Sequence, residues 1–248
     1  MPRSKRSRLV HTSRIAKVPS RQKSASQYAS LRAAIAAYPS LFLFSVSNMR
    51  NTYLKEIRQN FASDGRLFFG KTKVMAKALG LTPEEEAEPG LSGLARYLQG
   101  NVGVLCTERS VEETMRYLEE FVEVDFARAG IVAPRSFTVP AGVVYSTGGE
   151  VPQEEDVPSP HSLEQTLRKW GMPTRLEKGR VVLDQEFVVC EEGKALDSHQ
   201  TALLKVFGVA VAEFRVRVVA WWSKENGEVR VVDEGAVDGE GVEDMDED

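Results

Sequence analysis

Short apolar runs that alternate with helical segments constrain the fold of this chain more than any other feature. Residues 41–46 (LFLFSV) and 102–106 (VGVLC) are mainly apolar and short, which favours buried strands over helices. Between Tyr28 and Tyr38, by contrast, the apolar residues follow helical spacing. This alternation predicts an α/β fold, an α/β sandwich in which helices cover a sheet.

The pattern changes over residues 128–184, where Pro and Gly become frequent. We expect this segment to form a small α+β lobe with short strands and one helix, inserted into the first domain. The earlier pattern resumes at residue 185. The predicted α/β domain is therefore discontinuous and comprises residues 25–127 and 185–222.

Charge is distributed very unevenly along the chain. No Asp or Glu occurs before Glu56, whereas eleven Lys or Arg residues do. Through Gly80 there are sixteen basic and two acidic residues, and the remainder holds sixteen basic and thirty-four acidic residues. The net charge of -4 is therefore the sum of a strongly basic amino-terminal part and a strongly acidic remainder. A basic end of this kind binds phosphates and releases their counterions, so a nucleic acid is the leading partner hypothesis.

Both ends of the chain are predicted to be disordered. Residues 1–24 form a basic arm with few apolar residues and no carboxylate, and residues 223–248 form an acidic tail without hydrophobic periodicity. The arm could also serve only as a nuclear-import signal, and import and RNA contact use the same residue types.

The segment around Gly70 is the strongest candidate for phosphate contact. A strand ending at Gly70 and a helix starting at Thr72 leave free backbone amides at a positive helix end, and the absent side chain of Gly70 lets a phosphate approach. We predict one basic surface, although lysines that are merely solvated remain an alternative. Its residues are Arg50, Lys55, Arg58, Gly70, Lys71, Thr72, Lys73 and Lys77.

Residues 65–72 also match the P-loop pattern G-x-x-x-x-G-K-[ST]. In a P-loop the residues between the glycines form a loop, but here residues 66–69 have the composition of a strand. A nucleotide-dependent enzyme using Lys71 and Thr72 is therefore only a minor alternative. We predict no catalytic residue, no metal site and no cofactor, because the three histidines lack metal-ligand spacing.

The two cysteines and the hydropathy pattern indicate the cellular setting. Cys106 and Cys190 lie in apolar runs and are expected to be reduced core thiols of an intracellular protein. No apolar run approaches the length of a membrane span, and the amino terminus lacks a secretory signal. We therefore expect no membrane partner.

Several motifs together resemble one known family. They are MPRSKRSR (1–8), GKTKV (70–74), FTVPAGVVYS (137–146), EEDVP (154–158), HSLE (161–164) and LDSHQ (196–200). From residue 1 to about residue 222 the sequence resembles the mRNA turnover protein four family of ribosome assembly factors. That family is related to the ribosomal stalk-base protein of the large subunit, which has an RNA-binding α/β domain interrupted by a small lobe.

The resemblance implies a placeholder that binds precursor large-subunit ribosomal RNA at the stalk-base site and is later exchanged for the ribosomal protein. The implied partners are the pre-ribosomal particle, the neighbouring stalk-base ribosomal protein and a release factor that drives exchange. The implied location is the nucleus and nucleolus, with shuttling to the cytoplasm left open. RNA contacts carried over from the family are Gly70, Lys71, Thr72, Lys73 and the basic residues Arg3, Lys5, Arg6 and Arg8.

The ribosomal stalk-base protein itself is the main alternative. Proteins of that kind continue past the last strand into long apolar helices that hold the stalk dimers. Here only 26 residues follow Trp222, and they are strongly acidic. We therefore expect no binding of stalk dimers.

Overall fold

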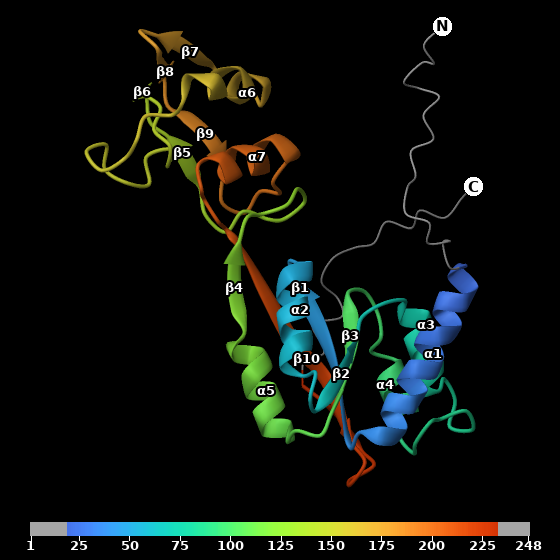
Figure 1. Ribbon diagram of the computed structural model, residues 1–248. Coiled ribbons are helices and arrows are strands. Elements are labelled where there is room, and N and C mark those ends of the chain that lie inside the picture. Colours follow the sequence, from blue (N-terminus) through green and yellow to red (C-terminus); the bar gives the residue numbers. More distant parts are fainter. Residues whose placement is uncertain (1–18, 233–248) are drawn as a thin grey trace, which may run out of the picture.

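The computed structural model describes residues 19–232, which form two lobes (Figure 1). The first lobe is a β-sheet with a hydrophobic core on each face. The second lobe has a separate core between short strands and short helices. The predicted mixed α/β architecture is confirmed.

The first lobe contains eleven helices and strands. Its helices are α1 (Ser20–Ala37), α2 (Asn51–Asn60), α3 (Thr72–Leu79), α4 (Ser92–Ala95) and α5 (Val111–Glu120). Its strands are β1 (Ser40–Ser47), β2 (Gly65–Phe68), β3 (Val102–Thr107), β4 (Val122–Asp125), β10 (Ala212–Ser223) and β11 (Val229–Val231). The strand order is β11-β10-β1-β3-β2, β4 also pairs with β10, and every pairing is antiparallel. Within residues 19–232 no helix has the length and apolar character needed to cross a bilayer.

Different helices cover the two faces of this sheet. Leu41 and Leu43 of β1 pack in the core formed with α1, α3 and α4. Phe42 and Phe44 point the other way, into the core formed with α2 and α5. Because successive strand residues face opposite sides, both cores draw on the same strand, and residues 41–44 are all apolar for this reason.

The second lobe extends further along the chain than predicted. Its elements are β5 (Phe137–Val139), β6 (Gly142–Val143), the 3-10 helix η2 (His161–Leu163), α6 (Glu164–Lys169), β7 (Thr174–Glu177), β8 (Arg180–Leu183), β9 (Phe187–Cys190) and α7 (Ser198–Val206). The strands form a β5-β9 pair and a β6-β8-β7 sheet. The predicted boundary at residue 184 is too early, because β9 and α7 pack in the core of the second lobe and the first sheet resumes only at Ala212.

Parts of the two segments predicted to be disordered form regular structure, namely residues 20–24 and residues 229–231. Helix α1 begins at Ser20, where the carbonyl of Pro19 accepts hydrogen bonds from the amides of Gln22 and Lys23, so residues 20–24 are helical rather than part of a disordered arm. In the predicted acidic tail, β11 pairs with β10. Residues 1–18 and 233–248, with most of the predicted arm and tail, lie outside the described residues.

Both cysteines are core residues, as predicted. Cys106 and Cys190 are buried and form no disulfide. Burial raises the pKa of the Cys106 thiol to about 12. A thiol with this pKa stays protonated near neutral pH and is a poor nucleophile.

Asp156 organises the loop between β6 and η2. Its carboxylate accepts hydrogen bonds from the Ser146 hydroxyl at 2.6 Å, from the Thr147 amide at 3.0 Å and from the Val157 amide at 2.7 Å, and also from the Thr147 hydroxyl. Desolvation by burial would raise its pKa, but these hydrogen bonds outweigh it and lower the pKa to about 2. The EEDVP motif therefore has a structural role in this loop.

Replacing Asp156 with Asn should destabilise the second lobe by about 2 kcal/mol at neutral pH, because hydrogen bonds to a charged acceptor are lost. A carboxylate with a depressed pKa stabilises the fold above its unfolded pKa, near 3.8, and that stabilisation is lost as the pH falls through about 2. The stability difference should therefore vanish in strong acid. Hydrogen exchange at the Thr147 and Val157 amides, measured from pH 7 downward, tests this. The control is Glu154→Gln, at an exposed position, which should change the protection of these amides little. An equal loss of protection in both variants would contradict the structural role of Asp156.

Candidate RNA-binding surface

The turn from β2 into α3 presents unpaired backbone donors. Lys71 precedes the helix in an extended conformation, and no side chain caps the helix. The amides of Val74 and Met75 donate to the Lys71 carbonyl. Those of Thr72 and Lys73 donate to no acceptor within residues 19–232. The predicted free amides at the positive end of this helix are therefore present, and anion binding by them stays a prediction.

Helix α3 separates its lysines from its apolar residues. Met75 and Leu79 are buried against α1 and the sheet, whereas Lys73 and Lys77 are exposed on the outer side. These two lysines are four residues apart, where like charges repel. Lys71, Lys73 and Lys77 form no ion pair with a carboxylate in the described part of the chain. Their positive charge is thus available to a ligand.

Helix α1 packs beside α3 and extends the same basic surface (Figure 1). Its sequence contains three basic residues and no acidic residue. The Lys71 Nζ donates to the Ser20 Oγ at 3.1 Å, and Lys23 lines a shallow groove with Phe68 at the end of β2. We call Lys23, Lys71, Lys73, Lys77 and the free amides of Thr72 and Lys73 the α1–α3 surface.

Gly70 has a different structural role from the one predicted. A Cβ atom at this position would lie 2.4 Å from Nε2 of Gln27, so the absent side chain makes room for α1 rather than leaving an open space for a phosphate. The glycine therefore allows α1 to approach the β2–α3 turn. Since Gln27 is long and flexible, a larger residue at Gly70 would displace it at modest cost.

The predicted single basic surface is divided by the sheet. Lys55 and Arg58 are exposed on α2, which covers the face opposite α1 and α3. Arg50, just before α2, is held by an ion pair with Asp125 at 3.0 Å and by a hydrogen bond to the Phe126 carbonyl. The residues at α2 therefore do not join the lysines of α3. Arg3, Lys5, Arg6 and Arg8 lie outside the described residues.

The structure also explains why the P-loop match is coincidental. Residues 65–68 form β2, which pairs in register with β3 from Gly65 opposite Thr107 to Phe68 opposite Val104. These residues form an extended edge strand rather than a loop, so their amides do not converge on one phosphate. The prediction of a strand between the two glycines is confirmed.

Comparison with known proteins gives two family matches that follow the two lobes. Residues 19–123 match the ribosomal protein L10 family, and residues 127–209 match the insertion domain found in the 60S ribosomal protein of that family. The second match includes β9 and α7, in agreement with the core of the second lobe.

Relatives that align over nearly their whole length identify the family of this chain more specifically. The ribosome assembly factor mrt4 of Neurospora crassa is 46% identical over 100% of this chain and 99% of its own length. That of Schizosaccharomyces pombe is 45% identical over 92% of this chain and 94% of its own length. The chain belongs to the Mrt4 family of ribosome assembly factors. The resemblance noted from the motifs is thereby confirmed.

The Mrt4 family is also related to a ribosomal protein. The large ribosomal subunit protein uL10 of Thermococcus onnurineus is 25% identical over 83% of this chain but only 57% of its own length. The chain therefore corresponds to part of uL10, whereas the assembly factors match along nearly their whole length.

One RNA-binding candidate was missed by the sequence reasoning. Lys23 fell inside the predicted disordered arm, but it lies on α1 next to the β2–α3 turn. The absence of any acidic residue across Ser20–Ala37 was the available signal.

Proposed function

We propose that this chain binds precursor large-subunit ribosomal RNA at the stalk-base site, as a placeholder that is later exchanged for uL10. One observation carries the proposal: the chain aligns with assembly factors over nearly their full length and with only 57% of a uL10 protein. A shared RNA-binding fold would let the two proteins occupy one site in turn.

The α1–α3 surface is the part of the fold best suited to this role. Its free amides can bind a phosphate oxygen, and its lysines add positive charge without demanding a particular base. The relatives are named as assembly factors and ribosomal proteins, which supports occupancy rather than catalysis. Arg3, Lys5, Arg6 and Arg8 are proposed to contact the same RNA, and Lys55 and Arg58 stay predictions without support from the geometry.

The setting follows from the same proposal. The partners would be a pre-ribosomal particle and a factor that drives exchange for uL10. The site of action would be the nucleus and nucleolus, where large subunits are assembled. The stalk dimers would not be bound.

A competition experiment tests the placeholder mechanism. A labelled stalk-base RNA fragment is saturated with the chain, and the uL10 protein of the same organism is then titrated in. We expect each uL10 molecule bound to displace one molecule of the chain, so that RNA carries one protein or the other. A stable ternary complex on one RNA would contradict the shared site, and absence of RNA binding by the chain would refute the whole proposal.

A further inference from the structure

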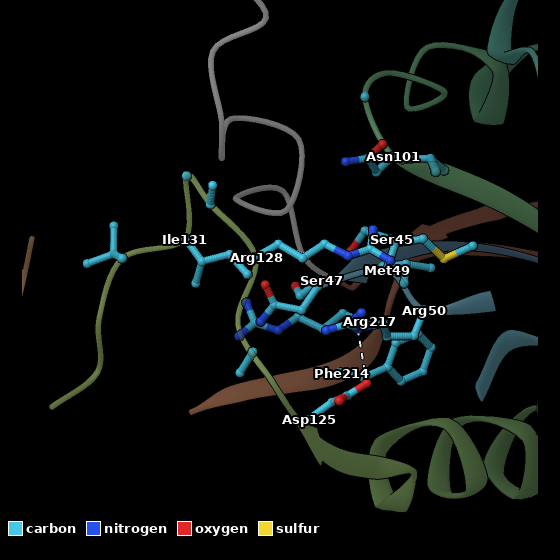
Figure 2. Close-up of a pocket in the computed structure, with 18 of the residues that line it drawn as sticks. Ser45, Ser47, Met49, Arg50, Asn101, Asp125, Arg128, Ile131, Phe214 and Arg217 are labelled. Atoms are coloured by element: carbon cyan, nitrogen blue, oxygen red, sulfur yellow. Dashed lines mark ion pairs between the residues drawn. The ribbon is translucent and has the colours of Figure 1, made fainter. Parts of the chain in front are cut away.

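A polar cleft lies where the two lobes meet and is separate from the α1–α3 surface (Figure 2). Its volume is about 790 Å³, large enough to hold a nucleotide-sized group. Three arginines from different parts of the chain line it, together with hydroxyl and amide side chains. We call it the interlobe cleft, with Ser45, Ser47, Asn101, Arg128 and Arg217 as its principal polar residues.

The sheet supplies one side of the interlobe cleft. Ser45 of β1 and Arg217 of β10 are cross-strand partners. Ser45 alternates with Leu43, so it lies on the sheet face that α1, α3 and α4 cover elsewhere. The remaining sides come from Asn101, just before β3, and from Arg128, in the connection to the second lobe. Figure 2 shows Arg128 and Arg217 close to the serines of β1.

Positive charge in this cleft is not balanced. Arg50 is neutralised by Asp125, which is the only carboxylate among the lining residues. Arg128 and Arg217 have no carboxylate within ion-pair distance in residues 19–232. Like charges that converge in a concave site raise its potential and attract an anion. Half-buried Ile131 and Met49 add an apolar border.

We propose that the interlobe cleft binds a single-stranded, phosphate-bearing segment of RNA, as a second contact distinct from the α1–α3 surface. Arg128 and Arg217 would each bind a phosphate, for which planar guanidinium groups provide paired donors. Ser45, Ser47 and Asn101 would donate to or accept from ribose and base, and Met49 and Ile131 would pack against a base.

Continuity with the α1–α3 surface favours RNA over an acidic peptide as the ligand of the cleft. The cleft lies at the end of the sheet where Ser45 pairs with Val102, and β2 leads into the β2–α3 turn at that same end, since Phe68 pairs with Val104, so one polymer with regularly spaced phosphates can reach both. The inference therefore rests on the proposed function. It deepens that proposal by assigning a role to two arginines that no sequence motif marks.

Replacing the cleft arginines tests RNA binding by the interlobe cleft separately from binding by the α1–α3 surface. In a filter-binding titration with a stalk-base RNA fragment and with oligouridine, Arg128→Ala and Arg217→Ala should each lower affinity about tenfold, as expected for loss of a charged hydrogen-bonded contact. Each should also reduce the magnitude of the salt slope by about 0.7 if the contacted RNA is single-stranded. The matched control is Arg180→Ala, an exposed arginine on β8, which should change neither quantity.

The outcomes distinguish the two proposals. If Lys71→Ala weakens RNA binding while the Arg128→Ala/Arg217→Ala double variant binds normally with an unchanged slope, the cleft proposal fails and the proposed function stands. If wild-type chain binds neither RNA, both fail. If the double variant loses affinity for polyglutamate but not for RNA, the cleft serves an acidic peptide, which also overturns the inference. Thermal unfolding of each variant confirms that the fold is intact.

Discussion

Reversing the charge of Lys71 and Lys73 together should lower the affinity of the chain for stalk-base RNA by about 100-fold to 1000-fold. Each substitution to Glu removes a phosphate contact worth about tenfold and adds repulsion at the same position. The N-terminus of α3 would also lose its attraction for an anion, because two carboxylates would lie beside the free amides of Thr72 and Lys73. Filter binding at a fixed salt concentration measures the effect, and a salt titration should show a reduced slope.

The opposite face of the sheet supplies a matched control. Lys55→Glu/Arg58→Glu makes the same change in net charge on α2, which the sheet separates from α3. We expect a much smaller loss, due only to the overall change in charge. Equal losses would mean that long-range charge rather than a specific surface governs binding. A loss confined to the α2 variant would move the RNA to the other face.

The sequence was sufficient to predict elements whose signal is local. The strand at residues 41–46, the helix beginning at Thr72 and the strand between Gly65 and Gly70 were all recovered, because apolar runs and glycine positions reflect the local backbone and its burial. The inserted lobe was also found, since its Pro and Gly content differs from its surroundings.

The remaining features depend on contacts that the local sequence does not encode. Helix α7 has the apolar spacing of any core helix, so periodicity could not decide which core receives it. Arg50, Lys55 and Lys73 are all basic residues at or near short helices, and only the sheet shows that α2 and α3 lie on opposite faces. Arg217 is one of several alternating strand residues in the sequence, and its convergence with Arg128 requires the fold of both lobes.

Replacing Trp222 with Ala should destabilise the first lobe by about 4 kcal/mol, the range expected when a buried aromatic side chain is removed. Trp222 is only 1% exposed and is the largest of the fully buried side chains. It packs in the core under α1, α3 and α4, and its indole N–H donates to the Pro89 carbonyl at 3.1 Å. The variant would leave a cavity and a carbonyl without its partner. Urea unfolding, followed by circular dichroism, should report the loss.

The neighbouring tryptophan provides the comparison within the same strand. Trp221 points to the other face, is only half-buried, and contacts the Phe42 ring at 6.5 Å between centroids and the Arg230 guanidinium at 5.5 Å. Trp221→Ala should therefore cost about 1 kcal/mol, typical of a partly exposed side chain. A large difference in stability loss between the two variants requires the strand register in which Trp222 faces the core under α1, α3 and α4. If Trp221→Ala proved the more damaging, the register of β10 beside Leu41 and Phe42 of β1 would be shifted by one residue.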